Sequence, residues 1–139
     1  MRTTTITMLS SAFVAVGLVA CAGDDKIASV IPGIETGTLE QSWTIDGTKD
    51  INKCNEHKAD RLRLIVIDSK DSVHATEFAE CRSFAMKLEL KTDSYTGNAT
   101  FVDANGYPVS KTLQLQPFTI LEDRTVTQTL EFKAEDMKP

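Results

Sequence analysis

The stretch LEQSWTI, residues 39–45, alternates along its length and sets the fold class of this chain. One face carries Leu39, Gln41, Trp43 and Ile45. Because successive side chains of a strand point to opposite sides, this period of two predicts a half-buried β-strand. Asp46-Gly47 follows directly and is typical of the turn that closes such a strand.

Other segments downstream show the same kind of pattern. LRLIVI, residues 62–67, is a largely apolar run of strand length and the best candidate for a central strand. MKLELK, residues 86–91, alternates strictly, and a helix there would scatter its charges around the axis. The remaining segments with a strand pattern are 78–84, 95–102, 107–113, 115–121 and 125–132, of which the one that contains Pro117 is expected at an edge.

The turn signals between these segments favour hairpins. In Asp103-Ala104-Asn105-Gly106 the Asn-Gly pair supplies the positive φ of a tight hairpin turn, and Glu122-Asp123-Arg124 is a polar turn. About seven strands in residues 38–132 predict an all-β fold, an antiparallel β-sandwich. Residues 52–61 are expected to form a helical turn or two, and residues 133–139 a C-terminal tail.

The head of the chain has the layout of a secretory signal. Met1-Arg2 is positive, and residues 8–18 are almost wholly apolar or small. That run is shorter than the ~20 residues of a membrane-spanning helix. Leu18-Val19-Ala20-Cys21, which follows it, resembles the bacterial lipobox.

The lipobox resemblance implies a lipid anchor. It implies a signal peptide of residues 1–20, cleavage between Ala20 and Cys21, a diacylglyceryl group on the Cys21 thiol and a further acyl chain such as palmitate on the new amine. At about 0.8 kcal/mol for each buried CH₂, two or three acyl chains anchor a protein almost permanently. The alternative is an ordinary signal peptide with a cysteine beside its cleavage site by chance.

The number of cysteines fits this interpretation. The chain has three, and an odd number in an exported protein needs an explanation. With Cys21 assigned to lipid, Cys54 and Cys81 remain as a pair suited to a disulfide bond in an oxidising compartment. Such a bond closes a loop of about 28 residues, for which chain entropy gives about 3.6 kcal/mol of stability, less any native strain.

Residues 21–37 are expected to be the lipidated N-terminus and a flexible tether. They hold several glycines, aspartates and a proline without a sustained period, although Val30-Ile31 is alternatively a short edge strand. In proteobacterial lipoproteins an Asp directly after the lipidated Cys retains the protein at the inner membrane. Because Ala22 stands there, the resemblance implies the outer membrane of a Gram-negative source, at its periplasmic face or its surface.

The charge of the chain argues against nucleic-acid binding. After removal of residues 1–20, 14 bases remain against 20 acids, a net charge of −6 with neutral histidines. Nucleic-acid-binding domains normally have a basic patch and a high isoelectric point, whereas the bases here are scattered among acids.

The mature chain also resembles a family as a whole. The order Trp43 to Gly47, Cys54, Cys81, Tyr95, Asp103 to Gly106 and Val109-Ser110 is similar to small, mostly uncharacterised β-sandwich lipoproteins of large-genome Gram-negative bacteria. The stretch from Tyr95 to Gly106 resembles a transthyretin-like/Ig-like sandwich. Trp43 precedes both cysteines instead of lying between them, which argues against an antibody-type domain.

Few residues form a pattern typical of chemistry. Cys54, His57, His74 and Cys81 are all residue types that zinc accepts, but in an oxidising compartment the two cysteines are expected to pair. Asp103 to Gly106 starts like a calcium loop and lacks the later ligands, and residues 68–72 are expected to be a solvated loop. No nucleophile stands beside a base in a known signature, so we assign no catalytic residue, no metal and no cofactor.

The sequence thus predicts a lipid-anchored envelope protein whose β-sandwich is a binding or structural module and not an enzyme. Its expected partners are the membrane, through the N-terminal lipid, and an envelope protein or a small ligand. Two alternatives stay open. One is a periplasmic metal-binding protein that uses Cys54, His57, His74 and Cys81, and the other is an enzyme with an unmarked active site.

Overall fold

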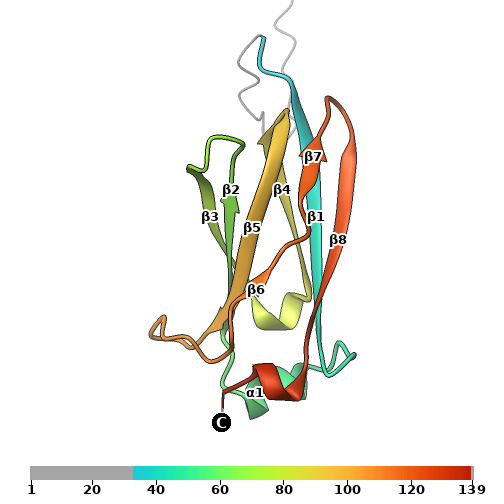
Figure 1. Cartoon of the computed structure of the whole chain (residues 1–139). Coiled ribbons are helices and arrows are strands. Elements are labelled where there is room, and N and C mark those ends of the chain that lie inside the picture. Colours follow the sequence, from blue (N-terminus) through green and yellow to red (C-terminus); the bar gives the residue numbers. More distant parts are fainter. Residues whose placement is uncertain (1–32, 139) are drawn as a thin grey trace, which may run out of the picture. The chain divides into compact units, whose positions relative to one another are not determined.

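The structure is a computed structural model, and it describes residues 33–138. The signal peptide, Cys21 and the tether up to residue 32 lie outside the described residues, as does Pro139. Within the described range the chain forms eight strands and three short helices (Figure 1). None of the described helices is long and apolar enough to cross a membrane.

Three strands form the first sheet, in the order β4-β1-β8. Their bounds are Thr36–Ile45 for β1, Ala85–Lys91 for β4 and Thr125–Phe132 for β8. The central strand β1 pairs antiparallel with β4 and parallel with β8, with Thr38 opposite Thr125 at one end and Ile45 opposite Phe132 at the other. The alternation predicted for β1 is confirmed, because every second residue from Gly37 to Ile45 is buried.

The second sheet has five strands. They are β2 (Arg61–Ile67), β3 (Val73–Glu80), β5 (Asp93–Val102), β6 (Leu113–Gln114) and β7 (Phe118–Ile120). The order is β3-β2-β5, and β6 and β7 pair with different parts of the same side of β5. Pro117, which has no N–H to donate, lies between β6 and β7 where the ladder is interrupted. Gly97 of β5 is required because a Cβ there would overlap the carbonyl oxygen of Ile65 on β2.

The two sheets pack face to face and enclose one core, so the predicted all-β sandwich is confirmed. Trp43, Phe101 and Phe132 are fully buried, and the rings of Phe101 and Phe132 lie 4.5 Å apart between their centroids. The other large core side chains with almost no exposure are Leu39, Ile45, Leu62, Leu64, Val66, Tyr95 and Ile120. Burial of apolar side chains, at roughly 25 cal/mol for each Å² removed from water, is the main force that holds the sheets together.

A disulfide bond between Cys54 and Cys81 closes one end of the sandwich. Cys54 lies in helix α1 (Ile51–Glu56), which begins after Asp50, whose carboxylate accepts the N–H of Asn52 at 2.9 Å. Cys81 begins the 3₁₀ turn η1 (Cys81–Ser83). Both cysteines are buried, with 4% exposure for Cys54 and 1% for Cys81. The disulfide bond predicted from the number of cysteines is confirmed.

The strand bounds differ from the sequence pattern at one place in particular. The pattern predicts a strand over 78–84, whereas β3 covers Val73–Glu80 and η1 follows it. The chain turns at Cys81 because that residue is bonded to α1, and Phe84 reverses it with a φ of 53°. The hairpin after β5 also differs, since only Gly106 of the Asn-Gly pair has a positive φ and the returning chain makes a single bridge to β5, between Pro108 and Val102, before β6.

Both ends of the described domain extend beyond the predicted limits of 38 and 132. Thr36 and Gly37, assigned to the tether, already pair with β4. In the segment assigned as a tail, the 3₁₀ helix η2 (Ala134–Asp136) is followed by Met137, which is 6% exposed and bridges to Ser110. Burial of Met137 explains why this segment packs against the sandwich.

The disulfide gives the fold a direct test. Replacement of Cys54 and Cys81 by Ser, in a chain that also carries Cys21→Ser, should lower the free energy of unfolding by about 3.6 kcal/mol or somewhat less. Urea unfolding followed by Trp43 fluorescence measures it, with the Cys21→Ser chain as the control. An unchanged midpoint would show that this end of the sandwich is held without the bond.

Candidate functional site

The four residues considered as zinc ligands do not form one site. Cys54 and Cys81 are bonded to each other, so neither sulfur is a free thiolate. His57 lies at the C-terminal end of α1, just before β2, while His74 is near the start of β3, beside the far end of β2. Seven residues of β2 separate these ends, which is about 20 Å. His74 instead packs against Tyr95, with ring centroids 5.3 Å apart.

The Asp103 loop serves as a turn. The Oδ1 atom of Asp103 accepts the backbone N–H groups of Asn105 and Tyr107, each at 2.9 Å. Gly106 holds the positive φ of 86° that this turn requires. The carboxylate is thus used by its own loop, as is usual for an Asx turn.

A hollow of the described domain lies at the end where β1 begins. We call it the tether-side hollow, and its volume is about 430 Å³. It lies between the β2–β3 turn, the first residues of β5, and β7. It is lined by Asp68, Ser69, Asp71, Ser94, Tyr95, Thr96, Pro117, Phe118 and Thr119.

The β2–β3 turn forms one wall and is held by its own first residue. The Oδ1 atom of Asp68 accepts the N–H groups of Lys70 at 2.9 Å and Ser72 at 3.0 Å. Asp71 has a φ of 59°, which is uncommon for a residue with a side chain. Its carboxylate makes no hydrogen bond or ion pair with any residue that the structure describes, so it is free to accept a ligand's donors.

A hydrogen bond ties this turn to β5. The hydroxyl of Ser69 donates to Oδ2 of Asp93 at 3.0 Å, and the N–H of Ser94 reaches Oδ1 of Asp93 at 2.7 Å. These two bonds stabilise the carboxylate, with the Ser69 hydroxyl as the larger influence, and they lower the pKa of Asp93 below its ordinary 3.8. Asp93 therefore stays charged through the neutral and mildly acidic range.

Two aromatic side chains support the hollow from the core side, where Tyr95 is 2% and Phe118 7% exposed. Tyr95 and Phe118 stack with centroids 5.6 Å apart, and the Tyr95 hydroxyl donates to the carbonyl oxygen of Lys91 at 2.9 Å. Burial, followed by the charges of Asp93 and Asp68, raises the pKa of Tyr95 above 10.0. The Tyr95 hydroxyl is therefore neutral and fixed, and it supports the hollow without carrying charge.

The rim is rich in hydrogen-bonding oxygens and poor in cations. Ser94 and Thr119 hydroxyls are 3.1 Å apart and bond to each other across β5 and β7. Among the described residues that line the hollow, two are carboxylates and none is Lys or Arg. The hollow can therefore accept hydrogen bonds from hydroxyl or amine donors, and it repels anions.

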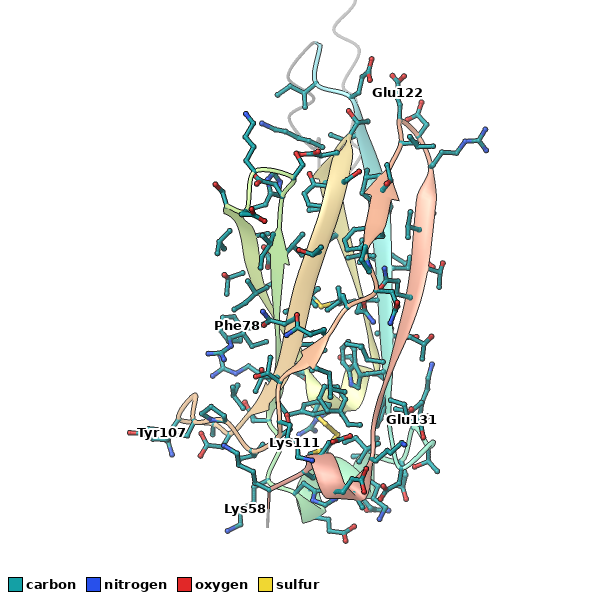
Figure 2. The ribbon with its side chains drawn as sticks, in the orientation of Figure 1. Lys58, Phe78, Tyr107, Lys111, Glu122 and Glu131 are labelled. Atoms are coloured by element: carbon teal, nitrogen blue, oxygen red, sulfur yellow. A yellow bond between two sulfur atoms is a disulfide. The ribbon has the colours of Figure 1, made fainter. Side chains whose placement is uncertain are left out.

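A second hollow at the opposite end has a different character. It occupies about 320 Å³ between α1, η1 and the Asp103 loop, and it is bordered by Lys58 and Arg82 as well as Asp60. Figure 2 shows Lys58 and Tyr107 at this end and Glu122 at the end where β1 begins. Two cations and the carboxylates of Asp60 and Asp103 border this second hollow, whereas carboxylates are the only charged groups among the described residues that line the tether-side hollow.

Sequence reasoning identified the β2–β3 turn only as a solvated loop. Its other partners in the hollow stand on β5 and β7, some 25 to 50 residues further along the chain. Ser94 and Thr119 become neighbours only through the pairing of β5 with β7. No spacing of residues along the sequence could therefore have predicted this site.

Comparison with known proteins gives little further guidance. No family model matches the chain, and no curated protein matches it. One similar solved structure is the Bacillus anthracis TIE protein, with a TM-score of 0.49 and 17% identity, over 71% of this chain and 17% of that one. Another, from Bacteroides thetaiotaomicron, is a DUF1812 protein whose description proposes polysaccharide binding. Its TM-score is 0.39 and its identity 14%, over 69% of this chain and 46% of that one.

The chain therefore spans less than half the length of either solved structure. At these levels of similarity neither structure carries an argument about the function of this chain.

The bond between Ser69 and Asp93 predicts a measurable pKa change. Ser69→Ala should raise the pKa of Asp93 towards 3.8, because it removes the hydroxyl that most favours the charged form. A folded-state pKa below the unfolded value stabilises the fold above pH 3.8, and this contribution is lost as the pH falls through the lowered pKa. Carboxyl ¹³C NMR titration measures it, with Thr96→Ala as the control; an unshifted Asp93 would contradict the assignment.

Proposed function

We propose that this chain is a lipid-anchored cell-envelope protein whose β-sandwich is a ligand-binding module. The observation that carries the proposal is the distance along the chain between the lipobox and the fold. Cys21 ends Leu18-Val19-Ala20-Cys21, and the first strand begins at Thr36, so only residues 22–35 separate the proposed lipid from the sandwich. A segment of this length reaches at most roughly 50 Å even when fully extended.

The short tether decides which end of the sandwich is nearer the membrane. Thr36 and Glu35 are held by two turns at this end, since the N–H of Asp123 donates to the Thr36 carbonyl at 2.9 Å and that of Thr92 to the Glu35 carbonyl at 3.0 Å. The tether-side hollow lies at the same end, beside the β4–β5 turn. Its ligands would therefore be groups within a few tens of ångströms of the lipid surface.

Anchoring adds to weak binding at such a site. A module that is confined to the membrane meets ligands on the same surface at a high effective concentration, so a modest intrinsic affinity is enough. The rim of the hollow suits this role, because the Ser94 and Thr119 hydroxyls bond to each other and Asp68 bonds to the backbone of its own turn. Ala22 after the proposed lipidated cysteine favours the outer membrane, if the source is Gram-negative.

Replacement of the Cys21 sulfur by an oxygen tests the lipid anchor. Cys21→Ser should block incorporation of a radiolabelled or clickable palmitate analogue and move the protein from the membrane fraction to the soluble fraction, because no thiol remains to be acylated. Cells that express each variant are fractionated and probed for both readouts.

The matched control is Cys54→Ser combined with Cys81→Ser, which makes the same chemical change at the two other cysteines and should leave acylation intact. Retention of the Cys21→Ser chain in the membrane fraction at the level of the unsubstituted chain would refute the anchor.

A further inference from the structure

We propose that the tether-side hollow binds a neutral saccharide. The inference deepens the proposed binding function, on which it rests for its location near the membrane, while the choice of ligand comes from the lining of the hollow. That lining combines free oxygen acceptors, hydroxyls and the exposed ring of Pro117 within about 430 Å³, a size within the roughly 300–1,000 Å³ of small-molecule sites.

The free acceptors match the donors of a sugar. Asp71 has both carboxylate oxygens unpaired among the described residues, and Asp68 uses only Oδ1 for its own turn. The Thr96 hydroxyl adds a group that both donates and accepts. Adjacent hydroxyls of a saccharide ring would each donate to a carboxylate, which is the stronger, charge-assisted kind of hydrogen bond.

The apolar side of the hollow matches the other face of a sugar ring. Pro117 is exposed beside Phe118, which stacks on the buried Tyr95. A pyranose has C–H groups on one face and hydroxyls around its edge, so it can cover the exposed ring of Pro117 while its hydroxyls meet the rim. Phe118 is only 7% exposed and supports Pro117 from the core side. Release of water from this apolar strip adds to the polar contacts.

Other classes of ligand fit the lining less well. Anions such as phosphate or uronate would meet Asp68 and Asp71 with no lining cation to offset the repulsion. A bare metal ion would lack ligands, since the described residues contain no cluster of three His, Cys, Asp or Glu residues able to hold one. A simple amine would satisfy the carboxylates but leave the hydroxyls and the apolar strip without a partner.

The walls are ordered before any ligand arrives. The Ser69 to Asp93 bond joins the turn to β5, the Ser94 to Thr119 bond joins β5 to β7, and the Tyr95 hydroxyl bonds to the carbonyl oxygen of Lys91. Because these walls need no reordering on binding, little conformational entropy is lost there, so even a small neutral ring can gain net affinity.

The experiment uses the exported Cys21→Ser chain, which keeps the whole mature sequence in soluble form. Methyl glucoside, methyl mannoside, N-acetylglucosamine and lactose are each titrated into ¹⁵N-labelled protein, with glucuronate as the anionic comparison. At least one neutral sugar should shift the amides of Ser69, Ser94 and Thr119, and it should do so at lower concentration than glucuronate.

Two variants separate a built site from general surface effects. Asp71→Asn removes the free charge of the rim and should weaken binding about tenfold, because a charge-assisted hydrogen bond becomes a neutral one. Glu122→Gln makes the same change on the neighbouring turn outside the hollow, where Figure 2 places it, and should leave the affinity unchanged.

The inference is overturned if none of the neutral sugars shifts the amides of the hollow, if glucuronate binds as well as they do, or if Asp71→Asn and Glu122→Gln bind alike. None of these results depends on acylation of Cys21. A negative result for saccharide binding is therefore distinct from a negative result for the lipid anchor. Only the fractionation of the Cys21→Ser chain tests the anchor.

Discussion

The hydrogen bond from the indole N–H of Trp43 to the carbonyl oxygen of Cys81, at 3.0 Å, holds the sandwich together at its disulfide end. Trp43 is fully buried in β1, and its backbone N–H donates to the carbonyl of Phe84 at 3.1 Å. The amide of Cys81 in turn donates to Asp60, just before β2. Both sheets and the disulfide meet at this point, and loss of the acceptor would leave a buried donor unsatisfied at a cost of about 1–3 kcal/mol.

The strands whose one face is buried could be predicted from alternation alone. The period of two in β1 and in β8, which runs from Thr125 to Phe132 as predicted, follows directly from burial against the second sheet. The turn at Cys81 could not be predicted this way, because it depends on a bond to a residue 27 positions earlier. Likewise, alternation indicates which side of β1 is buried and not that its neighbour β8 runs parallel.

The candidate site, too, could be predicted from the sequence only in part. The disulfide pair was predictable by counting cysteines, since assigning Cys21 to the lipobox leaves only Cys54 and Cys81 to pair. The tether-side hollow was not, because Asp71, Thr96 and Pro117 belong to three segments that only the sheet order brings together. The end of the sandwich that bears this hollow is also the end at which the chain enters β1, and this is the end that the proposed anchor would hold nearer a membrane.

We expect the junction at Trp43 to be the last part of the domain to open. Hydrogen exchange of the Trp43 indole N–H, measured by NMR beside the backbone N–H of Leu64 in β2, tests this most directly. We predict that both protons exchange only through global unfolding, with equal free energies of opening. Exchange of the indole proton by a much cheaper local opening, while Leu64 stays protected, would contradict the account.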